Sequence, residues 1–344
     1  MHLSDFSYDL SKELIATHPK EPRDGAKLMV VDRSTGKLQH SHFYDLPNFL
    51  KQGDFIVFNQ SEVIPARLFG KVDGKEVEIL LVKNGSANVW ETMAKPGKRL
   101  TKKVEVIFSD KLKAEVLDAT EGVFKLKFNL KGDDFWDEIG KIGEMPLPPY
   151  ILKQRHEKHE ENIDHKDYQT VYAKEKGSVA APTAGLHFTD KLLNEIKDKG
   201  CDIGFVTLHV GLGTFEPIRT KKLEDHKIHS EHFELSVDLA NNLNQAKKEG
   251  RRIIAVGTTT VRVLESCQKE GILESQAGET NIYIYPGYKF GFVEAMITNF
   301  HLPKSSLLLL VSAFWTREKI LDIYNEAMKN NYRFYSYGDG MFIF

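Results

Sequence analysis

Alternating apolar and polar residues dominate the stretch between about Arg67 and Met145, and this two-residue period is typical of strands with one face in water. The predicted strands are VEILLV (77–82), NVWETMA (88–94), KVEVIF (103–108), LKAEVLDA (112–119) and VFKLKFN (123–129). Gly, Asn and Asp turn residues separate them. A helix-like DDFWDEIGKIG and the proline cluster EMPLPPY (144–150) follow, and proline cannot continue a ladder or a helix. The pattern predicts a small antiparallel barrel or sandwich.

A longer rhythm, in which a helix precedes a buried strand, begins at about Tyr168. The predicted helix DKLLNEIKDKG stops at Gly200, and the predicted strand DIGFVTLHV follows it. The order recurs in the helix DLANNLNQAKKEG, the strand RRIIAVG and the helix TTTVRVLESCQKEG, whose first threonines are candidate caps. The segment DFIVFN (54–59) predicts a further buried strand, and the highly charged segment 153–167 predicts a solvated helix or loop. The fold class expected outside the strand-rich stretch is therefore α/β.

Composition limits the classes of protein that remain. The 344 residues, 41% of them hydrophobic, suffice to bury a core, and a formal charge of -2 argues against a histone-like or membrane-coating role. The two cysteines, Cys201 and Cys267, support neither a disulfide framework nor a thiolate zinc site, so we expect a cytoplasmic protein. No secretory signal is recognisable at the start, and the longest apolar run, LLLLVSAFW, is too short to cross a bilayer.

The segment SVAAPTAGLHFT (178–189) is rich in small residues. Small side chains let a backbone approach a ligand closely, and Thr183 and His187 would then add a hydroxyl and a titratable ring. A tight turn ahead of a helix capped by Thr189 and Asp190 explains the same residues equally well. A pocket wall and a structural turn are thus both open.

The stretch TLHVGLGTF (207–215) resembles the beginning of a dinucleotide site, because a strand leads into Gly211 and Gly213. The third glycine is missing and Pro217 arrives early, so the fingerprint fails. His209 stands at the predicted strand end, where α/β sheets hold their ligands, although a core histidine is the more common outcome.

Three histidines, His226, His229 and His232, flank Glu231 at spacings that would place metal ligands on one helical face. Histidine- and glutamate-rich surface turns are frequent, and a further clean ligand is missing. We therefore expect no metal.

The most informative local motif is AVGTTTVRVLES, where a buried strand leads into Gly257, Thr258 and Thr259 at a helix amino terminus. Free amides and hydroxyls at such a terminus favour carboxylates and ribose hydroxyls. The alternative is an ordinary capped helix with an ion pair between Arg262 and Glu265.

Two further stretches carry candidate groups. TNFHLPKSSLLLL places Thr298, Asn299, Phe300 and His301 at the lip of a buried apolar run. The basic cluster KPGKRLTKK (95–103) lies in a turn of the strand-rich module and is a candidate for phosphate contacts.

Together these stretches resemble the S-adenosylmethionine:tRNA ribosyltransferase-isomerase family, which makes epoxyqueuosine in bacterial tRNA. The resemblance runs nearly end to end and rests on DFSYDL, VIPARL, GEMPLPPYI, YQTVYA, GSVAAPTAGLHFT, LHVGLGTF, HSEHF, AVGTTTVR, YPGYKF, ITNFHLPKSSLL and YRFYSYGDGM. Departures are few: Asn59-Gln60-Ser61-Glu62 stands where the family usually has Asn-Asp-Thr, Ser306 replaces a usual threonine, and Gly340 stands where alanine is common.

The resemblance implies a barrel-like α/β catalytic domain, residues 1–66 plus 147–344, with a small antiparallel β-barrel domain, residues 67–146, inserted into it. It also implies the reaction. S-adenosylmethionine would act as cosubstrate and give its ribosyl group to 7-aminomethyl-7-deazaguanine at the wobble position of tRNA, with release of adenine and methionine. A monomer without a metal or a membrane partner is expected.

Such a reaction needs a base for the C5' proton beside the sulfonium, and histidine suits that task. The catalytic candidates are His187, His209, His229, Glu231 and His301. The candidates for binding S-adenosylmethionine are Thr183, Gly185, Phe188, Gly211, Gly213, Thr214, Phe215, Gly257, Thr258, Thr259, Asn299 and Phe300. The wobble base must leave its stack to be reached, so basic residues should line the entrance, and Arg67, Lys98 and Arg99 are placed there.

Two other functions stay open. A methyltransferase would share the cosubstrate, but it normally has a glycine-rich nucleotide loop, which this sequence lacks. A non-catalytic tRNA-binding protein built on the strand-rich module would bind tRNA in a salt-sensitive way without turnover.

Overall fold

The computed structural model describes residues 1–344 except 86–87, 121, 156–160, 212, 214–217 and 219. The chain divides into two compact units. The larger comprises Met1–Ser61, Gln169–Glu175 and Ala181–Phe344, and the smaller comprises Glu62–Tyr168 and Lys176–Ala180. The domain boundaries expected from the sequence, at 67 and 146, stay a prediction.

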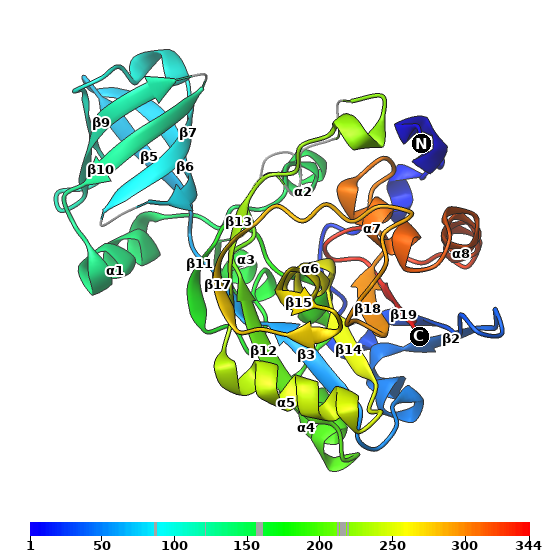
Figure 1. Cartoon of the computed structure of the whole chain (residues 1–344). Helices are drawn as coiled ribbons and strands as arrows, with labels where there is room; N and C mark the ends of the chain where they lie inside the picture. The colour runs from blue at the N-terminus through cyan, green and yellow to red at the C-terminus, as the bar shows by residue number, and fades with distance from the viewer. Residues whose placement is uncertain (86–87, 121, 156–160, 212, 214–217, 219) are drawn as a thin grey trace. The chain divides into compact units, whose positions relative to one another are not determined.

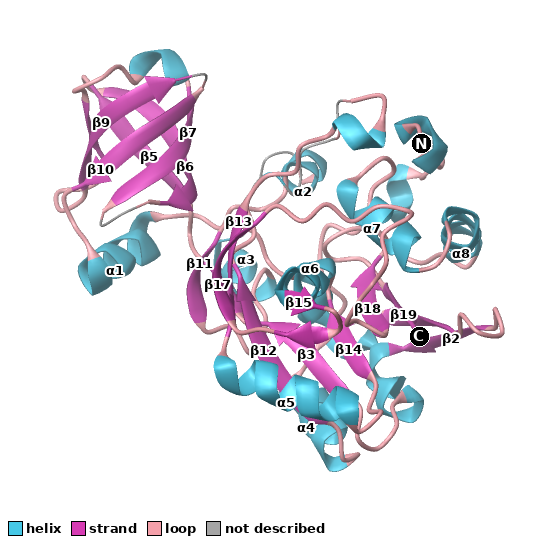
Figure 2. Ribbon diagram, in the orientation of Figure 1, coloured by secondary structure: helices cyan, strands magenta, loops and turns pink. Residues whose placement is uncertain are grey.

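The smaller unit contains a closed barrel of six antiparallel strands, in the order β10-β7-β6-β5-β8-β9 (Figure 2). Its strands are β5 (Arg67–Val72), β6 (Lys75–Asn84), β7 (Val89–Lys95), β8 (Glu105–Ile107), β9 (Lys113–Thr120) and β10 (Val123–Phe128). The predicted alternation is confirmed in β10, where Phe124, Leu126 and Phe128 are buried and the residues between them are exposed. Closure removes the sheet edges that an open antiparallel sheet would leave unpaired.

The helix α1 (Gly132–Ile142) follows the barrel, as the sequence predicts. Its buried Phe135 packs against two barrel residues, with ring centroids 5.9 Å from Trp90 and 5.0 Å from Phe128. The aromatic contacts join α1 to the barrel core.

The charged segment 153–167 is only partly solvated. It overlaps α2 (Pro149–Gln154) and α3 (Glu161–Asp167) and includes undescribed residues 156–160. Arg155 Nη1 donates to Asp164 Oδ1 at 2.6 Å, and both side chains are buried. The expectation of a wholly solvated segment is wrong here. The number of charged residues in a segment does not show which of them form buried ion pairs.

The larger unit is built on one nine-stranded mixed sheet, in the order β17-β13-β12-β3-β14-β18-β19-β1-β2 (Figure 1). Its strands are β1 (Lys27–Val31), β2 (Leu38–His42), β3 (Phe55–Asn59), β12 (Asp202–Leu208), β13 (Glu231–Leu235), β14 (Ile253–Val256), β17 (Gln276–Thr280), β18 (Ala295–Asn299) and β19 (Gly340–Ile343). The four central strands β12, β3, β14 and β18 are parallel. The expected α/β class with an antiparallel barrel is confirmed. The nine-stranded sheet forms the domain that was expected to be barrel-like. Two-stranded sheets are formed by β4 (Ser61–Val63) with β11 (Glu175–Ser178) and by β15 (Gln268–Lys269) with β16 (Ile272–Leu273).

The helices of the larger unit are α4 (Asp190–Asp198), α5 (Val237–Lys248), α6 (Thr258–Cys267), α7 (Ser306–Phe314) and α8 (Arg317–Lys329). One face of the sheet packs on α4 and on two 3-10 turns, η4 (Phe43–Phe49) and η6 (Thr183–His187), through a continuous apolar core. Helix α6 packs on β12, β13, β14 and β17. Within the described residues, no helix is long and apolar enough to cross a membrane.

Candidate active site

The carboxyl ends of the central parallel strands lie at one edge of the sheet, because parallel strands share their direction. Asn59, Leu208, Val256 and Asn299 are the last residues of β3, β12, β14 and β18. Open α/β sheets bind their ligands in the crevice outside this edge. Five of the candidates singled out from the sequence follow directly after one of these strands: His209, Gly257, Thr258, Phe300 and His301.

His187 and Asn299 form a buried pair at this edge. His187 Nε2 lies 3.0 Å from Asn299 Oδ1, and Asn299 Nδ2 donates to the carbonyl oxygens of Tyr335 at 2.9 Å and Ser336 at 3.2 Å. Those two carbonyls fix the orientation of the amide, so its oxygen faces the imidazole and Nε2 carries the proton. The lone pair is therefore on Nδ1, which has no hydrogen-bond partner among the described residues.

The surroundings of His187 keep its ring neutral. The residue is 4% exposed, and its imidazole stacks on Phe43 with ring centroids 4.1 Å apart. Burial lowers the pKa of His187 to about 4, although the Asn299 hydrogen bond acts in the opposite direction. At neutral pH the side chain is an uncharged base of fixed tautomer.

The segment that carries His187 is a tight turn, so the structural alternative for 178–189 is confirmed in its geometry. Gly185 N–H donates to Pro182 O at 2.8 Å, and Thr189 Oγ1 caps α4 by accepting from Leu192 N–H at 3.1 Å. A side chain at Gly185 would overlap the hydroxyl of Tyr172. Gly185 thus serves close packing of the turn, and the turn delivers His187 to the strand ends, with Thr183 half-buried at its start.

Gly257 turns the chain from β14 into α6 with a positive φ of 85°, a conformation that favours glycine. The expected threonine cap is wrong: Thr258, Thr259 and Thr260 are already helical, and no side chain caps α6. Thr260 Oγ1 donates instead to Val256 O at 2.7 Å. The first amides of α6 have no side-chain cap in the described part of the chain, and the buried Thr259 Oγ1 beside them has no partner there either.

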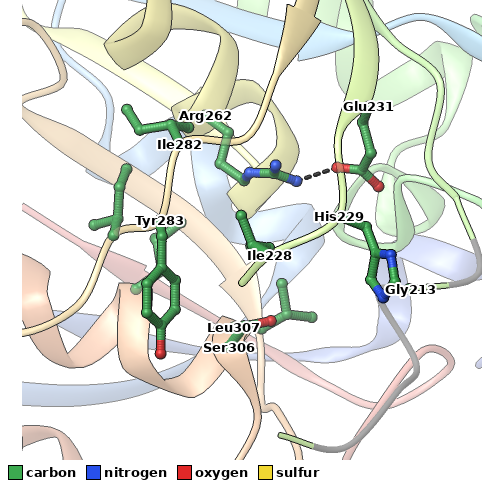
Figure 3. Close-up of a pocket in the computed structure, with 11 residues that line it drawn as sticks. Gly213, Ile228, His229, Glu231, Arg262, Ile282, Tyr283, Ser306 and Leu307 are labelled. Carbon is green, nitrogen blue, oxygen red and sulfur yellow. Dashed lines mark hydrogen bonds and ion pairs between the residues drawn. The ribbon is translucent and has the colours of Figure 1, made fainter. Parts of the chain in front are cut away.

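Glu231 and Arg262 form the charged wall of a pocket in the larger unit (Figure 3). Arg262 Nη1 donates to Glu231 Oε2, and Gly211 N–H donates to Glu231 Oε1 at 3.0 Å. Both side chains are buried. Gly213 packs under the His229 ring so closely that a Cβ would lie 2.6 Å from Cγ of the imidazole.

The expected ion pair between Arg262 and Glu265 does not form. Arg262 pairs with Glu231, whereas Glu265 accepts hydrogen bonds from Tyr288 Oη and from the amides of Gly291, Phe292 and Val293, all between 2.9 and 3.1 Å. Glu265 is therefore a structural anchor for the loop before β18. Nor do the three histidines share a helical face, because Glu231–Leu235 is the strand β13.

His209 follows β12 at the same sheet edge. Its ring stacks with that of His232, with centroids 5.8 Å apart. Its Nδ1 is covered from solvent without a partner in the described part of the chain. Burial, and then the neighbouring His232, lower the pKa of His209 to about 4.

His301, Phe300 and Phe188 lie in the core. His301 Nε2 is 2.9 Å from Thr298 Oγ1, its amide donates to Tyr324 Oη, and burial lowers its pKa to about 3. Phe300 and Phe188 are fully buried among other aromatic rings. Alternation of ring and polar residues after a strand does not distinguish a core ring from a ligand contact. The catalytic role expected of His301 and the ligand contacts expected of Phe300 and Phe188 stay predictions.

Arg67 lies in the smaller unit and is already paired. Its Nε donates to Glu78 at 2.7 Å and its Nη1 to Glu144 at 2.8 Å. Lys98 is exposed, and Arg99 Nη1 donates to Glu76 O. Lys98 is thus the best placed of the three to meet a phosphate.

Thr214 and Phe215 lie outside the described residues. In the described ranges no group of three His, Cys, Asp or Glu side chains is arranged to hold a metal ion. Sequence reasoning missed Tyr283 and Ser306 as pocket residues, because they come from the segment after β17 and from α7, which carry no local signal for a site.

Comparison with known proteins agrees with this arrangement of chain segments. The family model for the queuosine biosynthesis protein matches residues 3–343. The S-adenosylmethionine:tRNA ribosyltransferase-isomerase of Fusobacterium nucleatum subsp. nucleatum is 51% identical, covering 100% of this chain and 97% of that protein, and that of Acetivibrio thermocellus is 49% identical over all of both. The crystal structure of S-adenosylmethionine tRNA ribosyltransferase from Thermotoga maritima has a TM-score of 0.58 and 34% identity, covering 99% and 100% of the two chains. The chain therefore belongs to the queuosine biosynthesis protein family.

Proposed function

We propose that this protein transfers and isomerises the ribosyl group of S-adenosylmethionine onto 7-aminomethyl-7-deazaguanine in tRNA, as a ribosyltransferase-isomerase of queuosine biosynthesis. Membership of the family supports the activity. The observation that supports the site is the neutral, tautomer-fixed His187 at the strand edge. Its unpartnered Nδ1 suits the removal of a C5' proton from the carbon beside the sulfonium.

We place Asn299 as a positioning residue that holds the ring through Nε2. The amino end of α6, with Gly257, Thr258 and Thr259, offers amides and a spare hydroxyl to the ribose or the adenine edge.

Glu231 is not placed as the base, because its two oxygens already accept from Arg262 and from the Gly211 amide. His209 has a spare ring nitrogen and stays the second candidate base. His229 belongs to the pocket wall, beside Gly213. Lys98 and Arg99 are proposed to contact tRNA phosphates.

The decisive experiment is product analysis with labelled S-adenosylmethionine and tRNA that carries the precursor base. The proposal expects free adenine and methionine. Release of S-adenosylhomocysteine would favour a methyltransferase, and tRNA binding without turnover would favour a binding protein. His187→Ala should lower turnover by roughly 10²–10⁴-fold without loss of fold. His209→Ala tests the second candidate base. The matched control is His18→Gln, which replaces an exposed histidine.

The positioning role of Asn299 has its own readout. Asn299→Asp replaces the amide by a carboxylate beside the imidazole, and an adjacent negative charge raises a histidine pKa. The acidic limb of the pH–rate profile should then move to higher pH. An unchanged profile with merely lower stability would mean that Asn299 acts only on the fold.

A basic residue on the smaller unit is tested by salt dependence. Lys98→Ala should weaken tRNA binding and lower the slope of log K against log salt by about one. Arg67→Met should leave that slope unchanged, because the Arg67 charge is already compensated by Glu78 and Glu144. Equal slopes for wild type and Lys98→Ala would remove Lys98 from the interface.

A further inference from the structure

The loop formed by residues 333–339 contacts the active-site pair from a distant part of the chain. It leads into β19, which begins beside Asn299 in the antiparallel register of β18 and β19 (Figure 1). The carbonyl oxygens of Tyr335 and Ser336 in this loop accept from Asn299 Nδ2. The loop therefore determines which way the Asn299 amide faces, and with it which ring nitrogen of His187 carries the proton.

The residue after the loop packs on the other neighbour of the His187 ring. Phe43 stacks on that ring, and Gly340 lies against Phe43. A Cβ at Gly340 would lie only 2.8 Å from Phe43 Cζ. The loop and the residue after it thus contact both side chains that hold the imidazole.

Asp339 closes this loop with its carboxylate. Its Oδ2 accepts from Arg333 N–H at 2.7 Å, and its Oδ1 accepts at 3.0 Å from the N–H of Lys27, the first residue of β1. Its own N–H donates to Arg333 O at 2.8 Å, and Arg333 Nη2 lies 3.3 Å from Oδ1. Asp339 is 2% exposed, and a donor that loses its acceptor is costly in such surroundings. One carboxylate therefore holds the two ends of the loop together and ties them to β1.

Between these ends the loop is tightly folded. Gly338 N–H donates to Tyr335 O at 3.0 Å, and a Cβ at Gly338 would lie 2.5 Å from the carbonyl carbon of Phe334. Tyr335 has a φ of 75°, in the left-handed region that favours glycine. A residue keeps such a conformation only when its surroundings impose it. The positions of the loop carbonyls thus depend on the contacts that close the loop.

We propose that Asp339 is a positioning residue for the reaction, which closes the loop that orients Asn299 and thereby fixes His187 in one tautomer. The inference rests on the proposed function, in which His187 Nδ1 is the base. An amide cannot replace this carboxylate, because it has one acceptor oxygen for two backbone donors that approach different oxygens. In either orientation its nitrogen would face an N–H group, and one end of the loop would be released.

The test is the tautomer of His187 in the free full-length protein, with and without Asp339→Asn. The ¹⁵N chemical shifts of an imidazole distinguish its protonated from its unprotonated nitrogen, and comparison with His187→Gln assigns the signals. Wild type at neutral pH should carry a proton on Nε2 alone. Asp339→Asn should show a mixture of the two neutral tautomers, because a loosened loop lets the Asn299 amide turn over. An unchanged tautomer would overturn the proposal.

Steady-state kinetics give a second readout. Asp339→Asn should lower kcat by about 10- to 100-fold, the effect of a catalytic group displaced by up to about 1 Å. The KM of S-adenosylmethionine should change by less than about 3-fold, because the loop acts on the base. Asp339→Glu, which keeps both acceptor oxygens on a longer side chain, should recover part of the lost kcat. A fall in kcat without a change of tautomer would give Asp339 a structural role only and overturn the proposal.

Asp54→Asn is the matched control. Asp54 is also 2% exposed, and it also accepts from a backbone N–H and an arginine, with Lys51 N–H at 2.8 Å and Arg252 Nε at 3.1 Å. It precedes β3 at the amino end of that strand, opposite the edge that carries His187. This variant should lower Tm as Asp339→Asn does but leave the tautomer and kcat unchanged. A mixture of tautomers in both variants would indicate a general loosening of the fold and overturn the proposal.

A measurement on wild type serves where Asp339→Asn does not fold. The amides of Lys27 and Arg333 should exchange their hydrogens as slowly as those of β19, because the acceptor of each is a buried carboxylate. Rapid exchange at both amides would show that the carboxylate does not hold the loop, and would overturn the proposal.

The result is separable from that of the proposed function, because the tautomer is observed without turnover. If wild type releases neither adenine nor methionine, the proposed function fails whatever the tautomer is. If wild type turns over S-adenosylmethionine and the His187 tautomer does not respond to Asp339→Asn, only the positioning role fails.

Discussion

The Gly185→Ala substitution tests how the turn η6 delivers His187 to the strand ends. The added Cβ would overlap the hydroxyl of Tyr172 and lie 3.0 Å from Tyr172 Cζ and from Thr170 Cγ2. Overpacking of this kind typically costs about 1–3 kcal/mol. For a unit of this size we expect a Tm lower by about 2–4 °C for each kcal/mol. A shift of the turn that misplaces the His187 ring by 1 Å would also lower kcat by up to about 10²-fold.

The assay is a thermal melt and steady-state kinetics on the single variant and on Gly185→Ala combined with Tyr172→Phe. Loss of the hydroxyl removes the overlapping atom and leaves only the 3.0 Å contacts, so the double variant should recover most of the lost Tm. Gly278→Ala is the matched control, because a Cβ there meets nothing within 4 Å. A Gly185→Ala protein that melts with wild type, or a loss that Tyr172→Phe does not relieve, would refute the reasoning.

Three further predictions follow from the buried groups. His187, His209 and His301 have pKa values of about 4, 4 and 3 when folded, so below pH 6.5 the unfolded chain takes up their protons first; stability should be full above pH 6.5 and fall by about 1.4 kcal/mol per pH unit for each ring towards pH 4. Urea unfolding at pH 7 and 5 measures this, and His301→Gln, which removes one of the three rings, should lower the slope by about a third. Glu265→Gln should cost about 2–4 kcal/mol, because an amide group replaces an oxygen that accepts from the 288–293 loop; faster amide exchange at Phe292 would report it, and unchanged exchange would contradict it. Arg67→Met should cost about 1–2 kcal/mol in a thermal melt, since it removes the cation that two half-buried carboxylates share, and an unchanged melt would show that the two ion pairs do not stabilise the fold.

Local pattern predicted the elements well. The two-residue period of β10 and the glycine stop of α4 at Gly200, with a φ of 82°, depend on neighbours in sequence. The turn around Gly185 and the cap at Thr189 belong to the same class. Short-range sterics and hydrogen bonding govern these features, so they are visible in a single sequence.

Partnerships between distant residues could not be predicted in the same way. Arg262 has Glu265 one turn away on its own helix, yet it pairs with Glu231, 31 positions earlier in the chain. Strand β13 lies beside β12 in the sheet, and α6 packs on both, which brings the two charges together. Helical spacing alone carries no information about such strand order.

The sequence by itself determined the α/β and antiparallel regions, the turn residues and the motifs that identify the family, because each depends on local periodicity or on residue identity. Only the tertiary structure decided which residue fixes the ring of each buried histidine. His187 and His301 both follow apolar segments in sequence, but only His187 meets the amide of Asn299, 112 positions away, while Thr298 and Tyr324 enclose His301. The physical reason is that burial and hydrogen-bond partners, which set the pKa and the accessible nitrogen, arise from packing between segments that are remote along the chain.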